Sequence, residues 1–472
     1  MIFALKFAPP LAILKLILLF LCTPVSAEER VLTDITGRTV TVNIISVDSI
    51  NVTAIRISDG KTFSLPLEKL CQADQSYLLT LAEKDSWSSK NHSKKIAQLN
   101  QGIGLPFFHR ENHDLWNTSS KDLSSRLEWP LESSTDFDSS HRIYFKADQR
   151  LLGCRPYTAC LYSRANQPAL ITILYANKGD FASDPNQLKR QIQNDAEEIT
   201  TQMNGLLQEP IRDSIGKGKG FYQRVWRWNW QNTAFLLAEE PEDYLALYIM
   251  PTALADQKGQ FSKRSINEIR QRLLNNVEKR ENGDIILQNL PMVDQGPKGY
   301  CVPATFERYL RYLDIPADMY LIAMNAETSA GGGTSMNSFL EGIRSYARRF
   351  NISMKTIKKK VGISELARYI DRGVPIAWTH FSSTPFNKIA KQQTATRANS
   401  QNWEEESSSF FKQVKDATMP KDGPHIALIH GYNRQTKEIA FTDSWGPRFQ
   451  ERWIFADLAE KASQGSFYLI GM

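Results

Sequence analysis

The chain has 472 residues, of which 42% are hydrophobic and 23% charged, and its formal net charge is +6. This length and apolar content are enough for several buried cores and exclude a disordered or fibrous protein. The small positive charge forms no basic stripe and accompanies no nucleic-acid-binding motif, so we expect no nucleic-acid partner. Five cysteines are too few for a scaffold held together by disulfides.

Residues 1–27 have the pattern of a secretory signal peptide. Lys6 precedes an apolar run from Leu11 to Leu21, and small residues end at Ala27, where we expect cleavage. A retained anchor is the alternative, but the run is short for a bilayer span of about 20 residues. Cys22 lacks the small preceding residue of a lipoprotein site. We therefore expect a secreted or periplasmic protein that meets the membrane only through this segment before cleavage.

Residues 28–83 alternate short apolar runs with turn signals. The runs at 40–45 and 52–57 precede the tight-turn pair Asp59-Gly60, which predicts a small antiparallel β unit. With Thr33-Asp34, Gly37-Arg38 and a closing Leu-Pro-Leu, this pattern resembles the SLA-type homology domain, an SH3-like barrel. The resemblance implies a binding or spacer module whose partner would be a protein.

Residues 84–140 are polar and rich in serine, and we interpret them as a Ser-rich linker with patches of local structure. His109 and His113 lie four residues apart, a spacing that would place two metal ligands on one helix face. No third ligand is near, and Glu111 is not placed as in the zinc-peptidase helix motif. We therefore expect no metal site there.

Residues 141–280 predict a middle domain of the α+β class. A helix is expected at about 185–207, with strands at 169–175, 224–237 and 244–250. Ser265 and Glu268 form the capping-box pattern of a further helix. Cys154 and Cys160 flank a Pro-Tyr turn, and the sequence leaves open whether they form a disulfide or remain two buried thiols.

Three tryptophans, Trp226, Trp228 and Trp230, occupy every second position of one expected strand and therefore share one of its faces. Such a stripe can bind sugars or pack against a helix. Packing is the interpretation that we favour, because aromatic side chains dominate the burial of cores.

Residues 281–472 contain the candidate catalytic residues. After an expected strand at 284–287, Cys301 opens a stretch with apolar residues at helical spacing, so it lies at a helix N-terminus. Exposed N–H groups and the helix dipole favour a thiolate there, the form that attacks carbonyl carbons. Gln295, six residues earlier, is placed to donate its amide to an oxyanion together with the Cys301 backbone N–H.

Two further motifs follow far downstream. His425 lies in Gly-Pro-His-Ile-Ala-Leu-Ile-His-Gly-Tyr, and Asp443 begins Asp-Ser-Trp-Gly; they stand 124 and 142 residues after Cys301. Two adjacent strands of a hairpin would bring this histidine beside this aspartate. Taken singly, a cysteine, a histidine and an aspartate are usually structural. The order and spacing of all three favour a catalytic set.

These motifs resemble the papain fold, and most closely bacterial peptidases of the bacteriocin-processing, double-glycine type. The resemblance covers about residues 284–472. It implies a papain-like domain in which Gln295 donates to the oxyanion, Cys301 is the nucleophile, His425 the base and then the acid, and Asp443 the group that orients the imidazole. Tyr300 and Val302 depart from papain, which has a small residue and a tryptophan on either side of its cysteine. The aspartate replaces the asparagine of papain, as in the double-glycine peptidases.

The expected activity is hydrolysis of peptide or related amide bonds in a protein or peptide substrate, with no metal or organic cofactor. Two alternatives stay open. The same residues can serve an acyltransferase or a cell-wall amidase, and the chain can be a non-catalytic extracellular binding protein. Of the other histidines, His380 and His430 are assigned no role. The polar stretch 381–421 is either a lid or an inert insertion, and the glycine run at 331–333 is expected to line the cleft.

Overall fold

The computed structural model describes residues 29–471 apart from several short segments. These segments are 48–49, 110–113, 178–184, 217–222, 242, 260–264, 297–298, 316, 325–339, 341–352, 359 and 361. The predicted signal peptide, His113 and the glycine run at 331–333 therefore lie outside the described residues. Among the residues that are described, no helix has both the length and the apolar character needed to cross a bilayer.

The chain divides into two compact units, residues 1–95 and 96–472. The first contains a four-stranded antiparallel sheet in the order β1-β2-β3-β4, so the predicted β unit is present. Its strands are β1 (Glu29–Thr33), β2 (Thr39–Val47), β3 (Asn51–Arg56) and β4 (Thr62–Pro66). Its core contains Leu32, Val42, Val52, Ala54, Leu67, Leu70 and Leu78. The SH3-like identity of this sheet stays a prediction.

The expected linker at 84–140 is largely regular structure, so this prediction needs correction. The helix α1 (Gln72–Ile103) runs into it, and α2 (Ser120–Leu127), β5 (Leu131–Ser134) and the start of β6 (Asp138–Tyr144) follow. The serines mark helix ends rather than flexible chain: Ser119 caps α2 by accepting from the Asp122 N–H at 3.0 Å. Sparse but buried apolar residues of this stretch join one core: Ile96, Leu99, Ile103, Phe107, Phe108, Leu115, Trp116, Leu123, Leu127 and Trp129.

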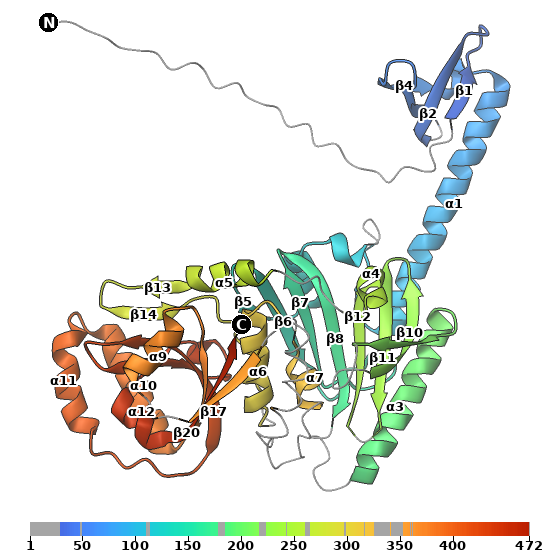
Figure 1. The fold of residues 1–472 in the computed structure, drawn as a ribbon. Coiled ribbons are helices and arrows are strands. Elements are labelled where there is room, and N and C mark those ends of the chain that lie inside the picture. The colour runs from blue at the N-terminus through green and yellow to red at the C-terminus, as the bar shows by residue number, and fades with distance from the viewer. Residues whose placement is uncertain are drawn as a thin grey trace, which may run out of the picture. The chain divides into compact units, whose positions relative to one another are not determined.

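The middle of the chain forms an eight-stranded antiparallel sheet in the order β5-β6-β7-β8-β12-β11-β10-β9. The remaining strands are β7 (Thr158–Arg164), β8 (Gln167–Asn177), β9 (Ile211–Ile215), β10 (Gln223–Trp230), β11 (Thr233–Glu240) and β12 (Tyr244–Pro251). The helix α3 (Pro185–Leu206) packs on one face (Figure 1). Phe235 and Leu237 of β11 face that core, whereas Leu236, between them, faces a second core. Because both faces are covered, the central strands are apolar throughout.

The tryptophan stripe of β10 packs into the core that α3 covers, as expected for packing rather than sugar binding. Trp228 is 2% exposed, and its indole Nε1 donates to the Asn204 side chain of α3 at 2.9 Å. Trp226 and Trp230 are partly buried against the same core. Trp228 therefore joins the helix to the sheet, and the two flanking tryptophans pack on the same core.

The C-terminal part of the chain forms a second eight-stranded sheet. Its path is β13-β14-β17-β16-β20-β15, with β18 paired to β17 and β19 paired to β18. The strands are β13 (Val277–Lys279), β14 (Asp284–Leu287), β15 (Ser353–Lys358), β16 (Ile376–Phe381), β17 (Pro424–Asn433), β18 (Glu438–Thr442), β19 (Arg452–Phe455) and β20 (Ser463–Gly471). The helices are α5 (Ile266–Asn275), α6 (Cys301–Tyr312), α7 (Met319–Met324), α9 (Ile363–Ile370), α10 (Thr384–Asn399), α11 (Trp403–Val414) and α12 (Ala456–Ala462). Together with the middle sheet, they give the α+β content that the sequence predicts.

The stretch 381–421 is a pair of helices, α10 and α11, rather than a loop. Gln393 of α10 is buried and donates to Glu438 at 2.6 Å. Arg397 of the same helix forms ion pairs with Asp284 and Glu438, both of which are buried. This insertion is therefore anchored in the core of the sheet.

Candidate active site

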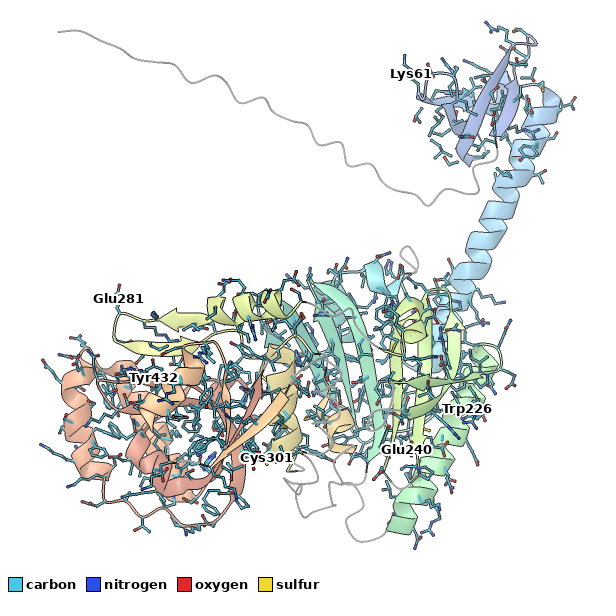
Figure 2. The ribbon with its side chains drawn as sticks, in the orientation of Figure 1. Lys61, Trp226, Glu240, Glu281, Cys301 and Tyr432 are labelled. Carbon is cyan, nitrogen blue, oxygen red and sulfur yellow. The ribbon has the colours of Figure 1, made fainter. Side chains whose placement is uncertain are left out.

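Cys301 is the first residue of α6, as predicted (Figure 2). The residue before it, Tyr300, makes no side-chain capping hydrogen bond, and the first turn of α6 contains no acidic residue. The N–H groups and the dipole of this turn are therefore not neutralised by a neighbouring carboxylate, and they favour a negative charge on the half-buried Cys301 sulfur.

His425 lies near the start of β17 and is buried. Its Nε2 lies 3.0 Å from Asp443 Oδ1, which leaves the other ring nitrogen, Nδ1, for the hydrogen bond between His425 and Cys301. Burial opposes the charged imidazolium, but the hydrogen bonds with Asp443 and Cys301 outweigh it and raise the pKa of His425 to about 9. At neutral pH the imidazole is accordingly protonated.

Asp443 follows the last residue of β18, and its side chain is fully buried. Strands β17 and β18 are antiparallel neighbours, with Leu428 opposite Thr442, so the expected hairpin does bring histidine and aspartate together. Although burial favours the neutral acid, the hydrogen bond from His425 and the nearby Arg452 guanidinium hold the pKa of Asp443 well below its usual range.

The other residues of the Asp-Ser-Trp-Gly motif also help to shape this site. The Ser444 carbonyl accepts a hydrogen bond from the Gln295 backbone N–H at 2.9 Å. The Trp445 ring stacks on the His425 ring, with centroids 4.6 Å apart and planes 25° apart. Gly446 has φ = +91°, a conformation that side-chain-bearing residues rarely adopt. The motif thus fixes the imidazole by a hydrogen bond and by stacking.

Gln295 lies in the loop between β14 and α6, and its backbone contact with Ser444 places it at the end of β18. Its side-chain Oε1 is buried and has no hydrogen-bond partner in the part of the chain that the structure describes. The turn after it needs a glycine, because Gly296 has φ = +64° and an added Cβ would lie 3.1 Å from the Tyr144 Oη. The loop is therefore held between the aspartate segment and the middle sheet.

The comparison with protein families concerns this same part of the chain. Residues 287–470 match the family model described as "Peptidase_C39 like family". We call this segment the C39-like domain. The match supports a papain-like cysteine peptidase, and it spans Gln295, Cys301, His425 and Asp443. No curated protein matches the chain.

The middle sheet, which lies outside the C39-like domain, contacts both sides of the candidate site. The Tyr300 hydroxyl, next to Cys301, donates to Asn177 of β8 at 2.9 Å. On the other side, the Asp294 N–H donates to Glu132 of β5 at 3.3 Å. The core shared by the two parts includes Val293, Tyr300, Ala304, Met319 and Tyr320. The sheet therefore supports the nucleophile and the glutamine loop directly.

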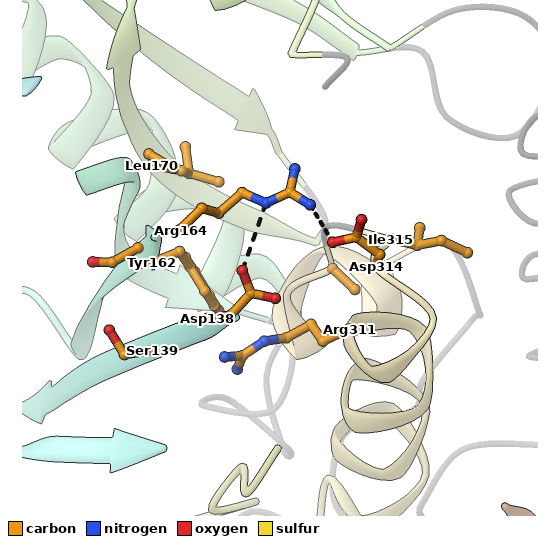
Figure 3. A pocket seen from close by; sticks show the side chains of 11 residues that line it. Asp138, Ser139, Tyr162, Arg164, Leu170, Arg311, Asp314 and Ile315 are labelled. Carbon is orange, nitrogen blue, oxygen red and sulfur yellow. Dashed lines mark hydrogen bonds and ion pairs between the residues drawn. The ribbon is translucent and has the colours of Figure 1, made fainter. Parts of the chain in front are cut away.

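Further along α6, polar contacts join the C39-like domain to the same sheet. Arg164 of β7 lies 3.5 Å from Asp138 and forms an ion pair with Asp314 at the end of α6 (Figure 3). These side chains line a small cavity of about 50 Å³. Neither Cys301 nor His425 lines this cavity, so it is separate from the candidate site.

Arg308 is a residue of the site that sequence reasoning missed. It is fully buried on α6, and its guanidinium donates to the Pro291 carbonyl at 2.7 Å and to the Thr442 hydroxyl at 2.6 Å. One side chain thus joins the nucleophile helix, the glutamine loop and the strand that ends beside Asp443. Burial lowers its pKa to about 10, so it remains charged at neutral pH. Its spacing was the available signal: it follows Cys301 by two helical turns and lies on the same face of α6.

Of the two histidines without an assigned role, His380 lies beside the candidate site and His430 does not. His380 of β16 is paired with His425 in the sheet register, and the two ring centroids are 5.4 Å apart. Burial and the neighbouring His425 lower the pKa of His380 to about 3, so it is a neutral neighbour of the imidazolium. His430 instead contacts the Leu287 carbonyl at 3.4 Å, away from the site.

The described part of the chain contains no cluster of three or more side chains suited to a metal ion.

Cys154 and Cys160 are both free cysteines. The sequence left open a disulfide or two buried thiols, and the structure shows two thiols. Burial raises the pKa of Cys154 to about 12 and that of Cys160 well above its usual range. Both thiols are accordingly protonated and poorly reactive.

Replacing Gln295 with alanine should lower the rate of substrate hydrolysis by about 10²-fold, because one oxyanion donor is removed. Gln288→Ala, an exposed position at the start of the same loop, serves as the control and should leave the rate unchanged. The comparison requires kcat for both variants with one peptide substrate. An unchanged kcat for Gln295→Ala would assign the oxyanion to another donor.

The histidines should make the free energy of unfolding depend on pH in opposite directions on either side of neutrality. Burial lowers the pKa of His380 to about 3 and of His430 to about 4, below the unfolded value near 6.5. Their contribution is present above about pH 6.5 and is lost as pH falls toward the folded values. The pKa of His425 is raised to about 9, so its contribution is present below about pH 6.5 and is lost as pH rises to 9.

Urea unfolding between about pH 5 and pH 9 should therefore give a maximum of stability near about pH 6.5 to 7. His425→Gln should remove most of the loss on the alkaline side and reduce the acid-side loss only in part, because burial is the main cause of the lowered His380 pKa and His430 is also involved. A wild-type alkaline loss that persists in His425→Gln would contradict the assignment of that loss to this histidine.

Proposed function

We propose that the protein is a secreted cysteine peptidase that hydrolyses peptide or related amide bonds through Cys301, His425 and Asp443. The observation that carries the proposal is the position of His425, whose Nε2 is 3.0 Å from a buried carboxylate and whose other nitrogen is left for the thiol at the start of α6. This arrangement suits a thiolate–imidazolium pair, the resting state that thiol hydrolases need.

The proposed reaction begins when the Cys301 thiolate attacks the carbonyl carbon of the substrate amide. The negative charge that develops on the carbonyl oxygen is stabilised by the Cys301 backbone N–H and by the Gln295 amide. The His425 imidazolium then gives its proton to the leaving nitrogen, and a thioester remains on Cys301. In the second half, neutral His425 takes a proton from water, the resulting hydroxide displaces the thiolate, and the acid product leaves.

Asp443 has an orienting role in this proposal. Its hydrogen bond to Nε2 selects the ring orientation in which Nδ1 faces the sulfur, and its charge stabilises the imidazolium. Stacking of Trp445 on the ring adds a second constraint on the same side chain. No proton needs to reach the carboxylate during the reaction.

The remaining parts of the chain suit an extracellular role. The sequence pattern of residues 1–27 supports export into an extracellular or periplasmic space. The β unit at residues 28–83 is proposed to bind a protein partner, and it carries none of the residues assigned to the reaction. Substrate specificity then belongs to the C39-like domain and to the middle sheet that contacts it.

The test is mass spectrometry of the products from a mixed peptide pool, incubated with and without a primary amine. Peptides cleaved by water support a peptidase, whereas amine-tagged products would identify an acyltransferase. The control is Cys301→Ala, which should give neither product. A folded wild-type protein that leaves peptides and cell-wall amides intact would contradict the proposal and favour a binding protein.

A further inference from the structure

Arg452 is a buried cation in direct contact with Asp443. It is the first residue of β19, stands opposite Phe441 of β18, and is 5% exposed. Its Nη1 forms an ion pair with Asp443 Oδ2, whereas His425 uses the other oxygen, Oδ1. The two oxygens of one carboxylate are thus divided between the imidazole and the guanidinium.

The guanidinium is itself held from the helical insertion. Its Nη2 donates to Asn387 Oδ1 of α10 at 3.0 Å. Asn387 is fixed in turn, because its amide nitrogen donates to the Ser382 carbonyl at 2.9 Å. The next residue of the strand, Trp453, donates its N–H to the Thr394 hydroxyl of α10 at 2.9 Å. A helix outside the predicted catalytic set therefore positions the cation that contacts Asp443.

The charges of the site explain what a cation does at this position. A thiolate, an imidazolium and a carboxylate together carry one negative charge, which is costly to bury without a partner. With the guanidinium, four charges of alternating sign stand in a row from Cys301 through His425 and Asp443 to Arg452. These four groups then carry no net charge, and Arg308 of α6 adds a further buried positive charge beside them.

We propose that Arg452 is a positioning residue that shares the Asp443 carboxylate with His425 and thereby sets how strongly His425 holds its proton. The catalytic role of Arg452 rests on the proposed function, whereas its contact with Asp443 is independent of that function. Fixing Oδ2 directs Oδ1 toward the imidazole. Placing a positive charge behind the carboxylate weakens its hold on the imidazolium, which makes His425 a better acid toward the leaving nitrogen.

Other charged or titratable groups also face this cluster. Cys301 and Arg308 approach from α6, and His380 approaches from β16. His380 is neutral above about pH 4, because its pKa is lowered to about 3, and Arg308 keeps its charge at neutral pH. Neither residue therefore changes charge between about pH 5 and pH 9, and the Cys301→Ala background removes the thiol, so that the titration follows His425 alone.

The test is an NMR titration of His425 in a Cys301→Ala background, with the Cε1–H signal assigned by its absence from His425→Gln. Removing the cation with Arg452→Met should raise the His425 pKa by about one pH unit or more. Arg452→Lys keeps a positive charge and should leave it close to the parent value. Arg280→Met removes a half-exposed ion pair with Glu451, the neighbouring residue, and is the matched control that should change nothing.

Asn387→Ala is the second variant, and it loosens the guanidinium without burying an unpaired carboxylate. It should raise the His425 pKa in the same direction by a smaller amount, and it decides the question if Arg452→Met does not fold. An unchanged His425 pKa in the folded variants would overturn the inference. Because the background lacks the nucleophile, this result is independent of whether any substrate is hydrolysed, which the peptide-pool experiment decides separately.

Discussion

Replacing Cys301 with alanine is expected to lower the rate of amide hydrolysis by about 10⁵-fold or more and to leave the fold intact. The side chain is half-buried and small, so its loss leaves little cavity. Of the other cysteines that the structure describes, Cys154 and Cys160 are buried and protonated, and Cys71 belongs to the first unit of the chain. The measurement is kcat with a peptide identified in the product analysis, alongside thermal unfolding of the variant.

Cys71→Ala is the matched control, because it removes another half-buried thiol, in the first unit of the chain. Its thiol donates to Asp74 Oδ2 at 3.3 Å. This variant should retain full activity. Activity that survived in Cys301→Ala but disappeared in Cys71→Ala would contradict the assignment, because it would place the nucleophile in the first unit of the chain.

Asp443→Ala should have the second largest effect, and it should act on both rate and stability. It leaves the His425 Nε2 without its acceptor and the buried Arg452 guanidinium without its carboxylate. We expect a loss of about 10³- to 10⁴-fold in kcat and of about 3–5 kcal/mol in the free energy of unfolding, because one partner of a buried ion pair is removed.

Asp443→Asn separates orientation from charge at the same position. Its amide oxygen can still accept from Nε2, so a weakened but measurable activity is expected, clearly above that of Asp443→Ala. Activity and urea unfolding are measured for both variants. Equal activities for the two would mean that this side chain does not orient His425.

The parts of the site that sequence predicted are those fixed by local pattern. Cys301 is placed by a helix start, whose apolar spacing is visible in the chain. His425 and Asp443 are placed by two strands joined by a short turn, and consecutive strands of this kind usually pair. The capping box of Ser265 and Glu268 is present for the same reason, because both of its hydrogen bonds are local.

The parts that sequence missed depend on long-range pairing. Arg452 reaches Asp443 because β19 pairs with β18. No local sequence pattern distinguishes this buried arginine from an exposed one. His380 lies beside His425 through the register of β16 and β17, which a single sequence does not specify. The linker prediction for 84–140 was wrong because serines at helix ends and strand edges have the composition of flexible chain.

The central proposal is that Cys301 and His425 form a thiolate–imidazolium ion pair, and limited alkylation tests it without a known substrate. Iodoacetamide at about pH 6 should modify Cys301 at least about 10-fold faster than Cys154 or Cys160, whose thiols are protonated and buried. His425→Ala should slow the labelling of Cys301 sharply, because the cation beside the sulfur is lost. If Cys301 instead labels no faster than a model thiol, or at a rate that ignores His425→Ala, the ion pair does not exist in the resting protein.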